Sequence, residues 1–281
     1  MKNQAKYIQQ ELSGLYTQSE ISVLTRLLLA EISNASFAEI SSDKSNHLSD
    51  TNRQKLEEMV RRLKNNEPIQ YILGTTEFYG LPFRVTPDVL IPRPETEELV
   101  EWILSENQTN TPLSILDIGT GSGCIPIALA KKLPNARVFA WDISEKALSV
   151  AAKNAKQNNV TVHFEIQDVF VPILSGIQFD IIVSNPPYVL DTEKETMEAN
   201  VLDYEPHIAL FVPSHNPLLF YERIADIACK HLNANGKLYF EINREKGNAV
   251  AKLLHEKGFT DITRRTDMEG NERMIRGARK G

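Results

Sequence analysis

Four consecutive residues, Asn185, Pro186, Pro187 and Tyr188, are of types that together can bind a planar amino group. Asn185 offers a side-chain carbonyl acceptor, Pro186 offers a backbone carbonyl, and Tyr188 offers a flat aromatic face. The loop is stiff because each proline fixes its own φ and restricts the residue before it. A planar amino group occurs on an amide or a nucleobase, so the loop is a candidate catalytic site. The alternative is a proline-rich turn that only ends a strand.

A glycine-rich loop is the second candidate. It comprises Gly119, Thr120, Gly121, Ser122 and Gly123, and it follows an apolar run that begins near Leu113. Glycines let a backbone turn tightly and approach a ligand closely. The spacing G-x-G-x-G departs from the dinucleotide pattern G-x-G-x-x-G, because Cys124 occupies the sixth position. The loop therefore indicates a cofactor site, and NAD is disfavoured.

Two acidic residues follow predicted strands. Asp142 lies 19 residues after Gly123, where a carboxylate can accept hydrogen bonds from both ribose hydroxyls of a cofactor. Asp168 is followed by apolar Val169, so this pair is a candidate for an adenine ring and its amino group. The alternative for each acid is a helix cap, and Ser144 is a second candidate for the cap near Asp142.

The elements that position these residues follow from the hydrophobic pattern. The run 179–184 is predicted to be a buried strand, directly before Asn185. From Ser114 onwards strands and helices alternate, which predicts a doubly wound α/β domain with a closing antiparallel strand. In such a sheet, ligands bind at the carboxyl ends of the strands. The candidate loops are therefore expected to meet at one edge.

The preceding part of the chain has a different pattern. A capping box at 17–20 and apolar residues at helical spacing predict a helix to about Ser33, and a second helix is predicted to end near Asn65. We expect an N-terminal helical domain over 1–66. Two short β-like runs, 75–79 and 81–85, predict a β-hairpin linker within 67–92. Residues 93–281 form the expected catalytic domain.

Composition narrows the classes of function. The formal net charge of −6 argues against a mainly electrostatic grip on nucleic acid. Two distant cysteines, Cys124 and Cys229, indicate neither a disulfide framework nor a zinc site, and no metal is expected. The first residues lack the apolar stretch of a signal peptide, and no apolar run approaches the ~18 residues of a membrane span. We expect a cytoplasmic protein without a membrane partner.

Five segments carry a resemblance to a known family. They are Glu67 to Gly74, Glu77 to Gly80, Ile91 to Glu97, Asn185 to Tyr188 and Tyr204 to His207. The chain resembles the S-adenosylmethionine-dependent methyltransferases of seven-stranded α/β fold, and more narrowly the release-factor glutamine methyltransferases, the PrmC/HemK family. The resemblance extends over nearly the whole chain, and the segment Arg93 to Glu97 is its most specific part.

The resemblance implies a fold, an activity and a site. It implies a helical N-terminal domain for substrate recognition, a hairpin linker and a methyltransferase domain. It implies methylation of a peptide-chain release factor on the glutamine nitrogen (N5) of a Gly-Gly-Gln loop, with S-adenosylhomocysteine as the product. Gly119 to Gly123, Asp142 and Asn185 fall on the family's cofactor positions, and 185–188 on its glutamine-binding loop. Val169 stands where some relatives have an aromatic residue beside the adenine.

Two other functions are compatible with the same motifs. A DNA adenine N6-methyltransferase would present a similar amino group to the loop at Asn185. The acidic charge, the absence of an obvious target-recognition domain and the segment Arg93 to Glu97 disfavour it. A non-catalytic cofactor-binding protein is the second alternative, and the intact loop 185–188 disfavours that one.

Overall fold

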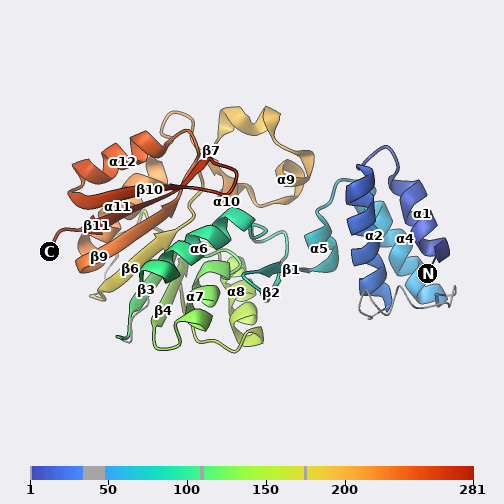
Figure 1. Ribbon diagram of the computed structural model, residues 1–281, viewed down its shortest axis with the longest axis horizontal. Coiled ribbons are helices and arrows are strands. Elements are labelled where there is room, and N and C mark those ends of the chain that lie inside the picture. Colours follow the sequence, from blue (N-terminus) through green and yellow to red (C-terminus); the bar gives the residue numbers. More distant parts are fainter. Residues whose placement is uncertain (1, 34–47, 108–110, 174–175) are drawn as a thin grey trace. The chain divides into compact units, whose positions relative to one another are not determined.

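The computed structural model describes residues 2–33, 48–107, 111–173 and 176–281 (Figure 1). By its contacts the chain divides into two compact units. The helical unit contains Met1–Gly74 together with Glu198–Tyr204, and the catalytic unit contains Thr75–Met197 and Glu205–Gly281. Among the described residues, no helix is long and apolar enough to cross a membrane.

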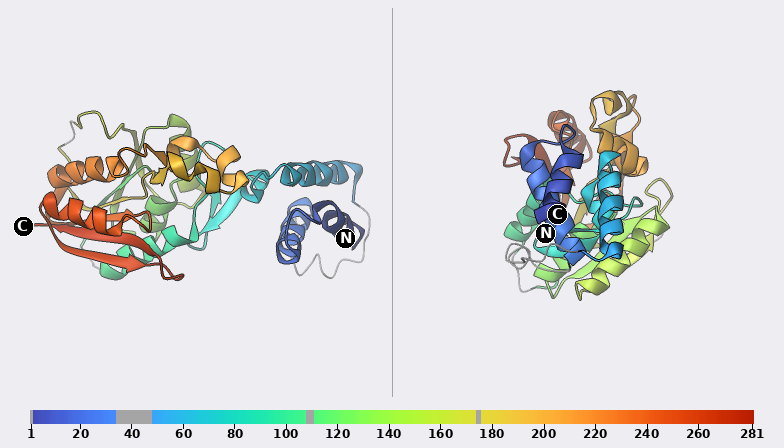
Figure 2. Two further views of the ribbon diagram at one scale, coloured as in Figure 1. Left: turned by 90° about the horizontal axis from the view of Figure 1, so that it is seen from above. Right: turned by 90° about the vertical axis from the view of Figure 1, so that its right-hand side faces the viewer.

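Three helices pack together in the helical unit, which is drawn mainly in blue in Figure 2. The expected capping box begins the second of them: the backbone N–H of Thr17 donates to Glu20 Oε2 over 2.7 Å, and Glu20 N–H donates to Thr17 Oγ1 over 3.3 Å. Leu28, Leu56 and Leu63 are fully or almost fully buried between the helices. The helices are α1 (Lys2–Leu12), α2 (Gln18–Ser33) and α4 (Asp50–Lys64).

Among the described residues of this unit, two further helices were not predicted from the sequence. Helix α5 (Ile69–Leu73) is only five residues long, bounded by Pro68 and by Gly74 in left-handed conformation, so it lacks the length for a helical hydrophobic pattern. Helix α9 (Ala199–Tyr204) is distant in sequence, and the hydroxyl of Tyr204 donates to the backbone carbonyl of Asn65 over 2.7 Å.

The catalytic unit begins with the predicted hairpin. Strand β1 (Thr75–Phe78) pairs antiparallel with β2 (Leu81–Arg84). Phe78 and Phe83 meet edge to face with ring centroids 5.9 Å apart, and both are buried. Their burial in the same apolar cluster as helix residues of the catalytic unit fixes the hairpin to that unit.

A seven-stranded sheet forms the centre of the catalytic unit, as predicted for this fold class. Its order is β10-β11-β9-β6-β3-β4-β5. Every pair from β9 to β5 is parallel, whereas β11 runs antiparallel to β9 and β10 antiparallel to β11. The strands are β3 (Ser114–Ile118), β4 (Arg137–Asp142), β5 (His163–Ile166), β6 (Phe179–Ser184), β9 (Leu232–Glu241), β10 (Phe259–Thr266) and β11 (Glu272–Arg279).

Helices cover both faces of this sheet (Figure 1). One face carries α6 (Pro94–Glu106), α7 (Cys124–Lys132) and α8 (Glu145–Gln157), and the other carries α11 (Leu219–His231) and α12 (Gly247–Glu256). The arrangement is the doubly wound fold expected from the alternating pattern.

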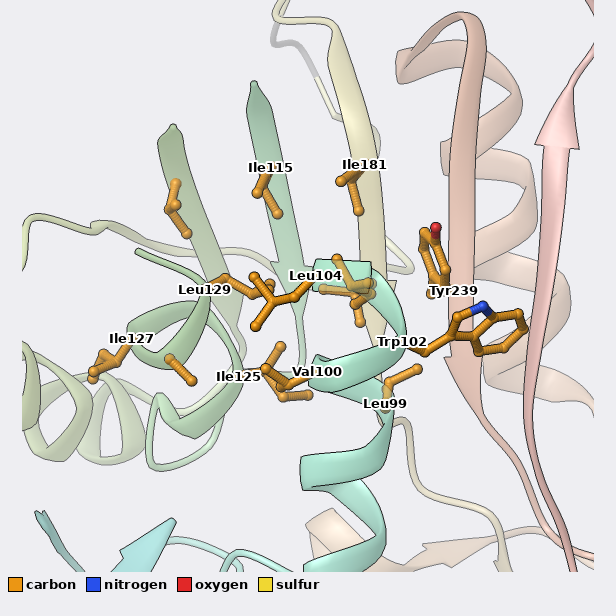
Figure 3. Packing of buried hydrophobic residues seen from close by; sticks show 14 of the residues in the cluster. Leu99, Val100, Trp102, Leu104, Ile115, Ile125, Ile127, Leu129, Ile181 and Tyr239 are labelled. Atoms are coloured by element: carbon orange, nitrogen blue, oxygen red, sulfur yellow. The ribbon is translucent and has the colours of Figure 1, made fainter. Parts of the chain in front are cut away.

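Helix α6 is held against the sheet by its apolar side (Figure 3). Leu99 and Val100 are fully buried, and the indole of Trp102 meets the ring of Tyr239 on β9 edge to face at 5.4 Å. The first turn of α6, which begins at Pro94, is thereby fixed relative to the strands. Thr96 of this turn is 3% exposed.

Short elements lie beyond β6. Strand β7 (Val189–Leu190) pairs in parallel with β8 (Phe211–Val212), and between them lie the 3-10 helix η1 (Asp191–Thr196), α9 and α10 (His207–Leu210). These pieces are too short for a periodic pattern, so the sequence did not predict them.

Candidate active site

A pocket lies at the carboxyl edge of the sheet, where the strand order changes direction between β3 and β6. Ile118 ends β3, Asp142 ends β4 and Ser184 ends β6, and all three residues line the pocket. Parallel pairing sets Ile118 beside Trp141 on one side and beside Ser184 on the other. The residues at and after these strand ends include the glycine loop, Asp142 and the loop at Asn185, which the sequence analysis predicted as cofactor-binding or catalytic residues.

The glycine loop is anchored to the end of β4. The backbone N–H groups of Gly119 and Thr120 both donate to the carbonyl of Trp141, over 2.8 and 3.1 Å. Gly121, which has a φ of 54°, donates its N–H to Asp142 Oδ2 over 2.8 Å. Gly119 and Gly121 line the pocket with their backbone, so the loop presents main chain to a ligand.

The other loop residues lie behind this surface. Thr120 and Ser122 are buried and do not line the pocket. Gly123 begins α7 with a φ of 81°, and a Cβ added there would lie 2.9 Å from Ile127 Cδ1. These three residues therefore shape the loop in this structure, while direct binding of a cofactor by them stays a prediction.

Asp142 is not the cap of helix α8. The cap is Ser144, whose side chain accepts from the N–H of Ala147 over 3.1 Å. Asp142 instead accepts from Gly121 through Oδ2 and from the N–H of Ser144 through Oδ1, each over 2.8 Å. Burial raises the pKa of Asp142, and these backbone hydrogen bonds oppose the rise. Its carboxylate lines the pocket.

Asp168 also begins no helix. Its Oδ1 accepts from the N–H of Phe170 over 2.8 Å, which closes a turn. Asp168, Val169 and Phe170 all line the pocket, and Phe170 packs against Phe220 with ring centroids 5.6 Å apart. Phe170 therefore gives the pocket an aromatic wall next to Val169. The sequence signal for this wall was the apolar run after Asp168.

Asn185 enters the pocket from the end of β6, with Pro186 and Pro187 next to it. Its side-chain Nδ2 donates to Thr96 Oγ1 over 3.3 Å. Thr96 Oγ1 in turn donates to Oε2 of the buried Glu241 over 2.7 Å. The nitrogen end of the amide is therefore directed at α6, and the carbonyl end is left for the pocket.

Tyr188 lies elsewhere than the loop motif suggested. It does not line the pocket, and its hydroxyl donates to Glu241 Oε1 over 3.1 Å. Burial raises the pKa of its phenol well above the ordinary value, and the nearby Glu241 adds to this. In this structure Tyr188 supports the loop from behind, and contact between its ring and a substrate stays a prediction.

The segment from Arg93 to Glu97 connects the site to its surroundings. Arg93 forms an ion pair with Glu205, whose other carboxylate oxygen accepts from the N–H of Ile91 over 3.2 Å. Glu97 accepts from the N–H of Tyr79 in the hairpin turn over 2.9 Å. The sequence analysis singled out this segment only by its resemblance to the family. In the structure its contacts connect the start of α6 to Glu205 and to the hairpin turn.

The chemistry of the pocket fits a nucleoside-containing cofactor. A carboxylate at Asp142 suits ribose hydroxyls, and a second acid at Asp168 stands beside an apolar wall. Exposed apolar residues extend this wall: Ile143, Phe170 and Ile208 are 50%, 46% and 62% exposed and all line the pocket. Ile143 and Ile208 were not predicted as site residues.

Two family models and several known proteins match the sequence. Residues 5–74 match the family described as PrmC N-terminal domain, and residues 96–203 match Methyltransferase small domain. The chain is 48% identical over 270 residues to the release factor glutamine methyltransferase of Bacteroides thetaiotaomicron, covering 96% of each chain. It is 45% identical over 279 residues to the one of Flavobacterium psychrophilum, covering 98% of each.

Solved structures add the fold. A methyltransferase from Pyrococcus furiosus superposes with a TM-score of 0.52 at 20% identity, covering 82% of this chain and 100% of its own. A human methyltransferase 10 domain containing protein gives a TM-score of 0.52 at 20% identity, over 72% of this chain and 90% of its own. Both superpositions support the methyltransferase architecture of the catalytic unit.

Proposed function

This chain belongs to the release factor glutamine methyltransferases, and from the pocket we propose how its residues perform that reaction. The enzyme methylates a glutamine side chain of a release factor. In our proposal, the target is the N5 nitrogen of the glutamine in a Gly-Gly-Gln loop, and Asn185 and Pro186 bind that nitrogen directly. Pro187 stiffens the loop, and Tyr188 supports it.

The observation that carries this proposal is the orientation of the Asn185 amide. Because Nδ2 donates to Thr96 over 3.3 Å, Oδ1 is the end available to a ligand. A primary amide has two N–H donors, and the loop supplies two acceptors, Asn185 Oδ1 and the carbonyl of Pro186. The number and type of groups match.

An amide nitrogen is a weak nucleophile because its lone pair is delocalised into the carbonyl. Two fixed acceptors hold its N–H bonds and so orient the nitrogen, and positioning of this kind can supply much of a rate enhancement. As positive charge grows on the nitrogen, the dipoles of Asn185 Oδ1 and the Pro186 carbonyl stabilise it. The proton can leave after transfer, so the proposal requires no dedicated base.

S-adenosylmethionine is the cofactor that the methyltransferase family implies, and the pocket residues fit it. When bound, it supplies a methyl group on a positively charged sulfur and leaves as S-adenosylhomocysteine. Asp142 would accept from the ribose hydroxyls, and the backbone of Gly119 and Gly121 would line the adjoining part. Asp168 and Val169 would bind the adenine, with Phe170 as the aromatic neighbour that Val169 does not provide.

We propose that the helical unit recognises the protein substrate. A single glutamine side chain offers few contacts, so selectivity for one loop must come from surface beyond the pocket. The relatives are named as release factor enzymes, and one matched family is the N-terminal domain itself. A release factor is therefore the proposed partner, and the cytoplasm, where translation occurs, is the proposed location.

The direct test is methyl incorporation followed by mass spectrometry. Purified enzyme and S-adenosylmethionine are incubated with a release factor, and the tryptic peptide containing Gly-Gly-Gln is examined. We expect a gain of one methyl group on that glutamine and none on a variant factor with Gly-Gly-Asn. Duplex DNA in the same assay tests the adenine alternative. Methylated adenine without methylated factor would overturn the proposal.

A further inference from the structure

Two buried polar residues stand behind the pocket without lining it. Thr96, in the first turn of α6, is 3% exposed, and Glu241, at the end of β9, is 1% exposed. They are 145 residues apart in sequence and 2.7 Å apart in space, from Thr96 Oγ1 to Glu241 Oε2. Both connect to the pocket through Asn185.

A free asparagine amide has two orientations of nearly equal shape. Rotating it by half a turn exchanges a carbonyl acceptor for an –NH2 donor at almost the same place. With the –NH2 end toward the pocket, Asn185 would face the N–H groups of a target amide donor to donor. The binding of such a target therefore requires something that selects one orientation.

Thr96 alone cannot make the selection, because a hydroxyl both donates and accepts. Glu241 removes that freedom. Its Oε2 accepts from the Thr96 hydroxyl, so the Thr96 proton points away from Asn185 and Oγ1 is left as an acceptor for Asn185 Nδ2. The other oxygen, Oε1, accepts from the Tyr188 hydroxyl, so both oxygens of Glu241 act as acceptors.

We propose that Thr96 and Glu241 are positioning residues that hold the Asn185 amide with Oδ1 facing the target amide. This inference rests on the proposed function and adds two residues that do not touch substrate. A buried carboxyl group that accepts from hydroxyls at both oxygens fixes the direction of a hydrogen-bond chain, which runs from Asn185 to Thr96 to Glu241.

The fold keeps the three residues in place from independent elements. Ser184, just before Asn185, pairs with Phe240, just before Glu241, so the two residues leave adjacent parallel strands at the same level. Thr96 arrives from α6, whose apolar side is docked on the sheet through Leu99, Val100 and Trp102 (Figure 3). Packing on the sheet thus fixes the donor and acceptor geometry.

The test compares Thr96→Val, Thr96→Ser and Glu241→Gln with the wild type in steady-state methylation of release factor. Thr96→Val keeps the shape but removes the hydroxyl, so kcat is expected to fall at least tenfold with KM within threefold. Thr96→Ser restores the hydroxyl and is expected to return kcat to within threefold. Glu241→Gln can donate to Thr96 and so reverse the chain, and its kcat is expected to fall at least as far as that of Thr96→Val.

A double-mutant cycle separates positioning from general damage. If Glu241 and Thr96 act only through Asn185, adding Thr96→Val or Glu241→Gln to Asn185→Ala should slow the reaction no further. A further tenfold loss in either double variant would overturn the inference. Full activity of Thr96→Val would overturn it as well.

Two controls keep the interpretation clear. Affinity for S-adenosylhomocysteine, measured by calorimetry, should stay within twofold of wild type in Thr96→Val, since Thr96 does not line the pocket. Thr260→Val changes a threonine of β10 in the catalytic unit that does not line the active-site pocket, and it should leave kcat unchanged. A wild-type enzyme inactive on release factor would contradict the proposed function itself. An active wild-type enzyme whose variants do not show the expected changes in kcat would contradict only the positioning role of Thr96 and Glu241.

Discussion

Asp142 Oδ2 accepts the backbone N–H of Gly121 over 2.8 Å, and this contact joins the end of β4 to the turn that follows β3. The same carboxylate lines the pocket. One side chain thus closes the glycine loop and faces the pocket. Its removal should affect both the shape of the loop and the binding of a cofactor.

Replacement of Asp142 by alanine should weaken the cofactor. A charge-assisted acceptor for ribose hydroxyls is worth about 1.5 to 3 kcal/mol, which is roughly a tenfold to 150-fold loss of affinity. Calorimetric titration with S-adenosylhomocysteine measures it. Glu145→Ala, an exposed acid in the next helix, is the control and should change little. An Asp142→Ala variant with wild-type affinity would leave Asp142 only its role in the loop.

Replacement of Asn185 by alanine should impair the chemical step. It removes one of two acceptors for the target amide, and by analogy with loss of an oxyanion-hole donor the cost is roughly 3 kcal/mol, on the order of a hundredfold in rate. Single-turnover methylation of release factor provides the rate. Near-normal turnover would exclude the proposed role, provided that affinity for S-adenosylhomocysteine shows an intact pocket.

Asp117 should make the fold less stable as the pH rises. It is fully buried on β3, and burial raises its pKa from 3.8 to about 7, against a smaller lowering effect of the Thr120 side chain. The folded state therefore binds a proton that the unfolded state has lost between about pH 4 and 7, and stability falls across this window.

The Asp117→Asn variant tests this, because an amide cannot ionise. A pKa near 7 in place of 3.8 corresponds to roughly 4 kcal/mol, so the variant's advantage in unfolding free energy should grow by about 2 to 3 kcal/mol from pH 5 to pH 8. Urea denaturation at both pH values measures it. A constant difference between variant and wild type would mean that Asp117 does not titrate in this range.

Glu106 should have the opposite effect in acid. Burial alone would raise its pKa, but hydrogen bonds from Arg276, Trp102 and Tyr239 lower it from 4.5 to about 2. Its stabilisation is therefore present above about pH 4.5 and is lost as the pH falls towards 2, by up to roughly 3 kcal/mol.

The Glu106→Gln variant should be less stable than the wild type at pH 7, and the gap should narrow at pH 3. Urea denaturation at the two pH values gives the comparison. Glu256→Gln, an exposed acid at the end of α12, is the control and should show no such gap. A gap for Glu106→Gln that is as large at pH 3 as at pH 7 would contradict the prediction.

Deletion of residues 1 to 65 should separate recognition from chemistry. We expect the truncated enzyme to bind S-adenosylhomocysteine normally, to lose most activity on intact release factor, and to lose less on a short Gly-Gly-Gln peptide. The deletion also removes the Asn65 carbonyl that Tyr204 binds, so Tyr204→Phe in the full chain is the control. Equal losses on both substrates would mean that the helices only support the fold.

Much of the architecture was predictable because local sequence patterns, such as hydrophobic periodicity and capping residues, indicate it. The run 179–184 is a strand in the structure as predicted, the hairpin pairs as expected, and the capping box at Thr17 begins α2. Hydrophobic periodicity and helix caps depend on residues only a few positions apart, so they can be found in a single sequence. Short pieces such as α5 and β7 were missed because they are shorter than the pattern that would reveal them.

The sequence also determined that Gly119, Asp142 and Asn185 meet, since each follows a strand of one sheet and parallel strands share a carboxyl edge. It did not determine their partners. That Thr96 contacts Glu241, and that Asp142 accepts from Gly121, depends on which strands are neighbours and on where α6 docks. Contacts over such separations result from packing of the whole sheet, which no local spacing encodes, so only the tertiary structure decided them.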